Sequence, residues 1–205
     1  MNTKNEALVE ATFPLDTGRH ELTILNNDGP YRHLKMRNPG SFFHWFEILT
    51  SPGMLVFSGD MKTFAFRGED DMLAFFETAG RATPSYLADK CVAPASVQEY
   101  SVDEFEKTLR PKVEEFAERR GLSVNEVWDQ VVTEVLDVAS DTASAVTAAG
   151  SVRHDGERVF EEPYELAMTD WDYHYLWCLR GISKAISMYR EKLLDVGITD
   201  DEVAV

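Results

Sequence analysis

Cysteine is scarce in this 205-residue sequence, and the two copies present cannot build a common metal or redox motif. Cys91 and Cys178 are far apart and lack the CxxC spacing of zinc and thioredoxin-like sites. Because a free cysteine behaves as a small apolar side chain, we expect two buried, unpaired thiols in a reducing compartment. A disulfide is not expected.

Long apolar runs are also missing. No stretch approaches the roughly 18 consecutive apolar residues of a membrane span. The start, "MNTKNEALVEATF", has no basic segment leading into an apolar one, as a secretory signal would. With 44% apolar residues, the chain is long enough to bury a core. These features predict a globular, cytoplasmic protein that does not enter a membrane.

The common catalytic motifs are absent as well. The sequence contains no GxSxG, HExxH, P-loop or GxGxxG motif and no DxDxDG calcium loop. The absence of these motifs removes the main sequence evidence for a hydrolase, metalloprotease, NTPase, dehydrogenase or EF-hand protein. We therefore predict a non-enzymatic protein and expect neither a metal nor a cofactor.

Basic residues are few, and the deficit is concentrated in the middle of the chain. The formal net charge is −16, and residues 69–172 hold 24 acidic against nine basic residues, whereas residues 1–68 hold seven of each. Contacts with phosphate groups need lysine or arginine to displace counterions, so this balance opposes direct nucleic-acid binding. It favours high solubility or a basic partner.

Aromatic and β-branched residues are plentiful near the N-terminus and alternate as strand residues do. Turn signals "NNDGP", "SPG" and "GD" separate them. We expect strands at 20–25, 31–36, 41–50, 54–58 and 62–67, the last three forming an antiparallel meander.

The strand expected at 41–50 is apolar on both sides. Alternation would place three large side chains on each face: Phe42, Phe46 and Ile48 on one, and Phe43, Trp45 and Leu49 on the other. We therefore expect both faces of the sheet to be covered, by helices or by another subunit, which is compatible with a homo-oligomer.

Helical patterns fill the rest of the chain. Capping boxes are expected at Ser101 with Glu104 and at Ser123 with Glu126, and Pro111 is expected to kink or divide its helix. The pattern predicts one α+β domain over 1–205, with an N-terminal antiparallel β-meander packed against several helices and a long C-terminal helix. Its parts are a sheet-rich region 15–68, an acidic helical region 69–150, a loop or hairpin 151–168 and the C-terminal helix 169–196.

The stretch 124–150, called the acidic segment below, has no basic residue. As one helix it would place apolar side chains on one side: Val127, Trp128, Val131, Val135, Val138 and Val146. Its acidic side chains would fall on the opposite arc, about 140° wide: Glu126, Asp129, Glu134, Asp137 and Asp141. No i+4 base relieves their repulsion. We interpret these five residues as partner-binding, with a merely solvated helix face as the alternative.

Residues capable of chemistry also occur near the meander. His33, His44 and Asp60 could serve a small enzyme or ligand-binding protein, although a histidine between aromatic residues and an aspartate in a turn are common structural features. Asp170 and His174 stand at i, i+4 spacing and could share a metal ion. A capped helix start explains those acids equally well.

Several stretches together resemble a family of small accessory proteins encoded by tailed bacteriophages and prophages. The specific part is the pattern WFxIxTxPGxLxxSGDMxTxxF, present as "WFEILTSPGMLVFSGDMKTFAF", followed by "DMLAFF", "EEPYEL" and "YHYLWCLRGISKAI". The resemblance covers roughly 31–76 and 160–190. It implies a genome context rather than an activity, and no catalytic residue is carried over.

Charge and resemblance together predict a phage-encoded inhibitor in the host cytoplasm. Carboxylates along a helix can stand in for DNA phosphates, so the expected partner is a host protein with a basic nucleic-acid-binding surface, as in anti-CRISPR or anti-restriction proteins. The alternatives are the small enzyme or ligand-binding protein described above and a structural or assembly protein of the virion.

Overall fold

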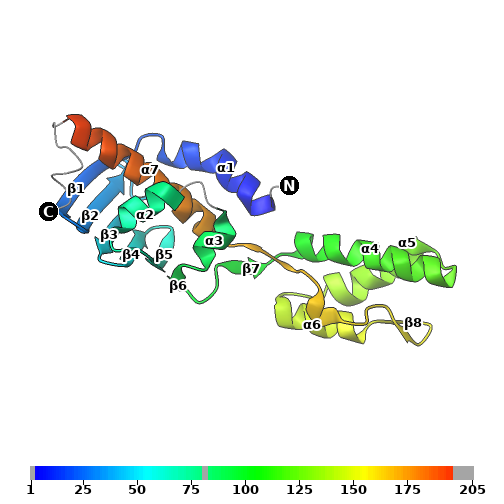
Figure 1. Cartoon of the computed structure of the whole chain (residues 1–205). Coiled ribbons are helices and arrows are strands. Elements are labelled where there is room, and N and C mark those ends of the chain that lie inside the picture. The colour runs from blue at the N-terminus through cyan, green and yellow to red at the C-terminus, as the bar shows by residue number, and fades with distance from the viewer. Residues whose placement is uncertain (1–2, 80–82, 196–205) are drawn as a thin grey trace. The chain divides into compact units, whose positions relative to one another are not determined.

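The computed structural model describes residues 3–79 and 83–195, and the chain divides into two compact units (Figure 1). Unit 1 comprises Met1–Val97 and Trp171–Val205, and unit 2 comprises Gln98–Asp170. The α+β class is confirmed. The sequence predicts one domain over 1–205, whereas the structure divides the chain into two units.

Unit 1 contains a six-stranded antiparallel sheet whose strands follow one another in chain order. This meander is larger than expected, because a short strand after the third helix of the chain extends it. The strands are β1 (Glu21–Asp28), β2 (Tyr31–Arg37), β3 (Phe46–Ser51), β4 (Met54–Gly59), β5 (Lys62–Arg67) and β6 (Cys91–Ala93).

Helices of unit 1 pack along one side of this sheet (Figure 1). They are α1 (Lys4–Thr17), α2 (Met72–Ala79), α3 (Pro84–Ala88) and α7 (Tyr173–Asp195). The first was not anticipated. The last is the expected long C-terminal helix; it begins at Tyr173, after a short strand, and position 196 lies outside the described residues.

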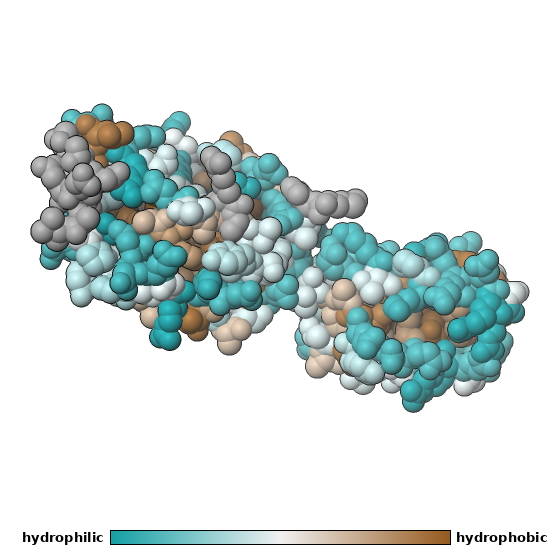
Figure 2. Space-filling model, in the orientation of Figure 1, coloured by the Kyte–Doolittle hydropathy of each residue, from teal (hydrophilic) through white to brown (hydrophobic). Residues whose placement is uncertain are grey.

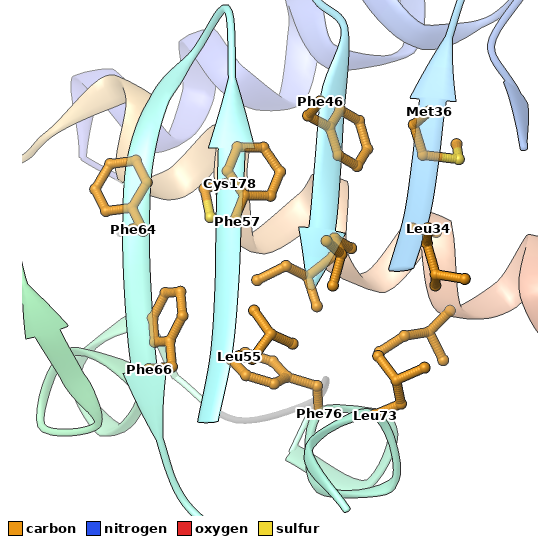
Figure 3. Packing of buried hydrophobic residues seen from close by; sticks show 14 of the residues in the cluster. Leu34, Met36, Phe46, Leu55, Phe57, Phe64, Phe66, Leu73, Phe76 and Cys178 are labelled. Atoms are coloured by element: carbon orange, nitrogen blue, oxygen red, sulfur yellow. The ribbon is translucent and has the colours of Figure 1, made fainter. Parts of the chain in front are cut away.

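The buried side of the sheet is lined by rings from neighbouring strands (Figure 3). Phe46 and Phe57 stack with centroids 4.8 Å apart, and Trp177 of α7 meets both of them edge-on at 5.6 and 6.3 Å. Such pairs contribute about 0.5–1.5 kcal/mol each beyond their buried area. Helix α7 approaches closely because it has Gly181 there, whose Cβ would lie 3.1 Å from the Phe57 ring.

The helices of this chain cover only one face of the strand expected at 41–50, and coverage of the other face by another subunit stays a prediction. Phe46 and Ile48 are fully buried, but Phe42 and Phe43 are 81% and 70% exposed. The strand begins only at Phe46, because the backbone of His44 adopts a left-handed conformation (φ 61°) that interrupts an extended chain. Residues 41–45 therefore form a loop.

Unit 2 is a helical unit entered and left through two paired strands, β7 (Gln98–Tyr100) and β10 (Thr169–Trp171). Its own core is built mainly by Phe105, Leu109, Val113, Val127, Val131 and Val135, all fully buried. The elements between are α4 (Val102–Arg120), α5 (Val124–Val131), the π-helix η1 (Val132–Leu136), α6 (Thr142–Ser151), the hairpin β8 (Arg153–His154) and β9 (Glu157–Arg158), and the 3₁₀ turn η2 (Pro163–Glu165).

The single helix expected over the acidic segment is divided. Helix α5 passes into a π-helical turn, and a new helix starts after Asp141, whose side chain caps it by accepting from the Ser144 N–H at 2.8 Å. Val138 is consequently 57% exposed rather than buried. The cap expected from Ser123 is also absent, since its side chain makes no capping hydrogen bond. Pro111 was expected to kink or divide its helix, but α4 continues through Pro111 without division.

Within residues 3–79 and 83–195, none of the helices combines the length and the apolar character that crossing a bilayer requires.

Candidate functional site

All five acidic residues proposed as partner-binding are exposed to solvent. Glu126 and Asp129 lie on α5, Glu134 on the π-helical turn, Asp137 just after it, and Asp141 at the start of α6. The opposite side of the same segment is anchored by the buried valines of the unit 2 core. The carboxylates are therefore held on well-packed backbone, although on three consecutive elements instead of one helix.

Among the described residues, none of these five carboxylates forms an ion pair with a basic side chain. Glu134 accepts a hydrogen bond from the neutral amide of Gln130, at 3.0 Å. The pKa of Asp141 is lowered by hydrogen bonds from the backbone and then the side chain of Ser144, which stabilise its charged form. The charged form of Asp141 is therefore favoured by the start of α6 rather than by a basic side chain.

The ion pairs of unit 2 involve acidic residues outside the acidic segment. This unit contains 18 acidic and only seven basic residues. Arg110 lies over the Trp128 ring, 4.7 Å from its centroid. The ion pairs of unit 2 join Lys107 to Glu104 (2.5 Å), Arg110 to Glu114 (3.2 Å), and Arg120 to Glu157. The basic side chains that form these ion pairs neutralise other acids, and none of them pairs with the five carboxylates of the acidic segment.

Figure 2 shows hydrophilic side chains surrounding a small hydrophobic area on the visible side of unit 2. Carboxylates without a basic partner attract basic macromolecules and accelerate their encounter, and this attraction weakens as salt is added.

Of the candidates near the meander, His33 lies beside an acidic partner. Its Nε2 is 2.9 Å from Glu47 Oε2, and Lys35 Nζ is 2.6 Å from Glu47 Oε1. Hydrogen bonds from Lys35 and then His33 lower the pKa of Glu47. The three side chains occupy β2 and β3 on the side of the sheet away from the helices.

His44 and Asp60 are also brought together, in a structural role. The His44 N–H donates to Asp60 Oδ2 at 2.8 Å, and the His44 carbonyl accepts from His20 Nε2 at 2.8 Å. These two bonds hold the left-handed backbone of the loop. The His44 ring is 6.1 Å from that of Trp177, and its Nδ1 is 3.8 Å from a carboxylate oxygen of Asp16.

The three candidates therefore do not form one site. His33 pairs with Leu49, three positions along β3 from Phe46, so about 10 Å of strand separates it from the end of β3 near His44. His44 also faces α1 and α7, whereas His33 points away from them.

The helical i, i+4 spacing expected for Asp170 and His174 is absent, because Asp170 lies on β10 and α7 begins only at Tyr173. Asp170 is buried at 3% exposure, and the His174 N–H instead donates to Asp172 at 2.7 Å. Burial raises the pKa of Asp172, but its hydrogen bonds from Lys62 and from the first turn of α7 outweigh that effect and lower it. Among the described residues, no group of three or more His, Cys, Asp or Glu side chains could hold a metal ion.

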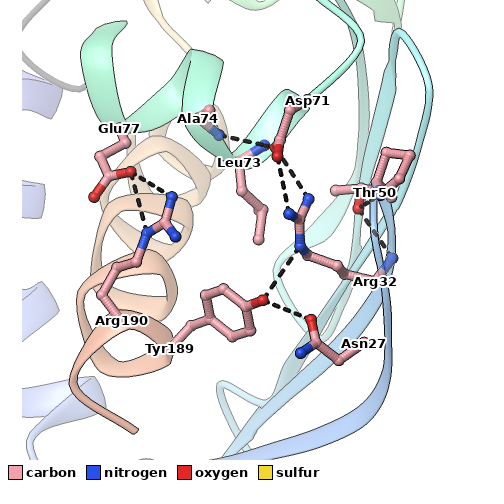
Figure 4. A network of polar contacts seen from close by, with 10 residues as sticks. Asn27, Arg32, Thr50, Asp71, Leu73, Ala74, Glu77, Tyr189 and Arg190 are labelled. Atoms are coloured by element: carbon pink, nitrogen blue, oxygen red, sulfur yellow. Dashed lines mark hydrogen bonds and ion pairs between the residues drawn. The ribbon is translucent and has the colours of Figure 1, made fainter. Parts of the chain in front are cut away.

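A buried polar network in unit 1 was not anticipated (Figure 4). The guanidinium of Arg32, 3% exposed, donates to both oxygens of Asp71 at 3.0 and 2.8 Å and to the Tyr189 hydroxyl at 3.3 Å. Tyr189 donates in turn to Asn27 at 2.6 Å. Asp71 also accepts the Leu73 and Ala74 N–H groups at 3.0 Å, so it caps α2. The network joins the sheet, α2 and α7.

Comparisons with protein-family models, with curated proteins and with solved structures gave no match to this chain. The similarity to phage accessory proteins therefore stays a prediction from sequence patterns.

Proposed function

We propose that this chain is a non-enzymatic, phage-encoded binding protein whose unit 2 presents the acidic segment to a basic nucleic-acid-binding surface of a host protein. A restriction, recombination or CRISPR complex is the class of partner that has such a surface. Occupying it excludes the nucleic acid, so the outcome is inhibition in the host cell.

The observation that carries this proposal is the lack of internal neutralisation. Within the described chain, five exposed carboxylates lie on one continuous segment, and every ion pair of unit 2 is made by other residues. Leaving like charges unrelieved costs a few tenths of a kcal/mol for each close pair, a cost that bases at i+4 would remove. A basic partner supplies the missing compensation.

The spacing of the charges supports a phosphate-like role. Four of the carboxylates fall between Glu126 and Asp137. At about 1.5 Å of rise per residue this is roughly one charge per 5–6 Å, compared with one phosphate per about 3.4 Å along a DNA strand. The segment thus offers a sparser line of charge of the same kind. Asp141 contributes less, because its carboxylate is engaged in capping α6.

The alternative of a small enzyme at the meander has weaker support. Its residues His33 and His44 face opposite sides of the sheet, and Asp60 is occupied by the loop backbone. Catalysis requires the acid, the base and the substrate within hydrogen-bond reach of one another, and these three side chains do not converge.

The test is affinity capture from a bacterial host lysate at about 0.05 M salt, followed by elution with rising salt. We expect the partner to elute by about 0.5 M, since the screening length falls to a few ångströms there. Duplex DNA should compete with the chain for the captured protein. Retention that is indifferent to ionic strength, or unaffected by DNA, would contradict the proposal.

Charge-reversal variants locate the contact. The first variant changes three residues of the acidic segment to lysine: Glu126, Asp129 and Glu134. The matched control makes the same charge change on exposed positions of α4: Glu106, Glu115 and Glu118. We expect the first to lose at least tenfold in affinity and the control to lose far less. Equal losses would mean that total charge, rather than this segment, governs binding.

A further inference from the structure

The side of the sheet opposite α1, α2 and α7, called the open face below, carries exposed apolar side chains. Leu49 on β3 is 41% exposed, and its cross-strand neighbours Val56 on β4 and Ala65 on β5 continue the same row. Tyr31 on β2 and Val92 on β6 are exposed at either side of it. A solvated sheet face is usually polar, as this one is at Thr23, Ser58 and Thr63. The apolar row across its centre therefore indicates a contact surface.

The charges of the open face balance, unlike those of the chain. Strand alternation places three acidic and three basic residues there, within a protein of net charge −16. They are Glu21, Asp28, Glu47, Lys35, Arg37 and Arg67. Lys35 and Glu47 already pair with each other at 2.6 Å. The open face therefore attracts neither a strongly basic nor a strongly acidic partner.

The loop before β3 adds aromatic anchors to this surface. A hollow of about 230 Å³ is lined there by Lys35, Arg37, Ser41, Phe42, Trp45 and Glu47. Lys35 Nζ lies 5.7 Å from the Trp45 ring centroid, and the Arg37 guanidinium lies 5.9 Å from that of Phe42. Tryptophan, tyrosine and arginine dominate the binding energy of protein interfaces. Because the His44 backbone is fixed by Asp60 and His20, the hollow is preformed.

We propose that the open face binds the open face of a second copy of this chain, forming a symmetric dimer by sheet-on-sheet packing. Two copies of charge −16 repel each other wherever their acidic surfaces meet, and the neutral open face is where they approach without that cost. In a two-fold interface each patch faces itself, so a balanced mixture of acids and bases is complementary to its own copy.

The size of the open face approaches that of one side of a standard interface. Five strands about 20 Å long and the shorter β6, all about 4.8 Å apart, give a flat area of the order of 500 Å². The relief of the side chains and the adjoining loop bring the accessible area toward the ~800 Å² per partner of a standard interface. Sheets packed in this way align within about 30°.

Sedimentation equilibrium of the full chain over about 1–100 µM tests the proposal. We expect a dimer that persists at about 0.5 M salt, because apolar burial is not screened as charge attraction is. Leu49→Lys combined with Val56→Lys should shift the chain to monomer, with an unchanged circular dichroism spectrum.

The matched control places lysines at exposed leucines of α1, as Leu8→Lys with Leu15→Lys, and should remain dimeric. A wild-type chain that is monomeric at about 100 µM, a dimer that survives the open-face substitutions, or one that the α1 substitutions disrupt equally would overturn the proposal. These outcomes are independent of the acidic segment, whose binding is salt-sensitive.

Discussion

The pairing of Arg32 with Asp71 leads to an unequal and testable pair of mutational effects. Arg32 is buried at 3% exposure, whereas the Asp71 side chain is 39% exposed and keeps two backbone N–H donors of α2 whether or not the arginine is present. Removing the aspartate leaves a buried guanidinium without its partner. Removing the arginine leaves a carboxylate that water can reach. The first change should therefore cost more stability.

Magnitudes follow from these contacts. Asp71→Ala loses a helix cap, worth about 1 kcal/mol, and leaves the guanidinium unpaired, which costs about 2 kcal/mol after a discount for the half-open site. Arg32→Met loses its hydrogen bonds but fills the space, at about 1.5 kcal/mol. The double variant should cost about 2.5 kcal/mol, because no unpaired charge remains. Arg32→Met is thus expected to restore part of the stability that Asp71→Ala removes.

Urea unfolding followed by tryptophan fluorescence is the assay. Three tryptophans lie in unit 1 and only Trp128 lies in unit 2, so a Trp128→Phe background makes the signal report on unit 1 alone. A double-mutant cycle then gives the coupling energy directly. If Arg32→Met is more destabilising than Asp71→Ala, or if the double variant is less stable than both single variants, the reasoning about the buried charge is refuted.

Two further predictions concern single residues. Asp141→Ala should destabilise unit 2 by about 1 kcal/mol through loss of the α6 cap, as measured by Trp128 fluorescence in urea. The control Asp137→Ala, at an exposed neighbouring position, should change the stability of unit 2 little. Equal effects of the two substitutions would show that the cap is unimportant. Burial lowers the pKa of His20, so below pH 6.5 the unfolded chain takes up a proton that the folded chain resists, and the free energy of unfolding should decrease as the pH falls. His20→Gln should reduce the slope of the free energy of unfolding against pH. An unchanged slope would contradict the assignment to His20.

The strands were predictable because side chains that alternate between the two faces of a strand leave a two-residue pattern in the sequence. The expected strands at 31–36, 54–58 and 62–67 agree with β2, β4 and β5 to within one residue. The stretch 41–45 failed for a physical reason: its aromatic residues imitate a strand, but the left-handed backbone of His44 depends on contacts with residues distant in sequence.

Helix boundaries were less predictable, although some signals were present. The Thr3–Glu6 capping box that starts α1 could have been recognised, whereas Asp141 with Ser144 is a capping box without the usual glutamate or glutamine and was overlooked within a continuous helical pattern. Because the valines keep helical spacing on both sides of the break between η1 and α6, the sequence predicts one helix there.

The polar network was beyond sequence reasoning. Arg32 meets Asp71 across 39 positions and Tyr189 across 157 positions of the chain. No local period links such residues, and an arginine in a strand is usually taken as solvent-facing. Only the folded sheet and its covering helices bring these partners together.

The division of unit 1 between the two ends of the chain has a consequence for its synthesis. On the ribosome, the whole of β1 to β6 emerges long before α7, while Gln98–Asp170 is complete earlier and has its own core. Until α7 has been synthesised, the phenylalanine rings of the meander lack the helix that shields them. A stalled or truncated product would therefore expose the apolar face of the sheet, and we expect chaperones to bind such a nascent chain.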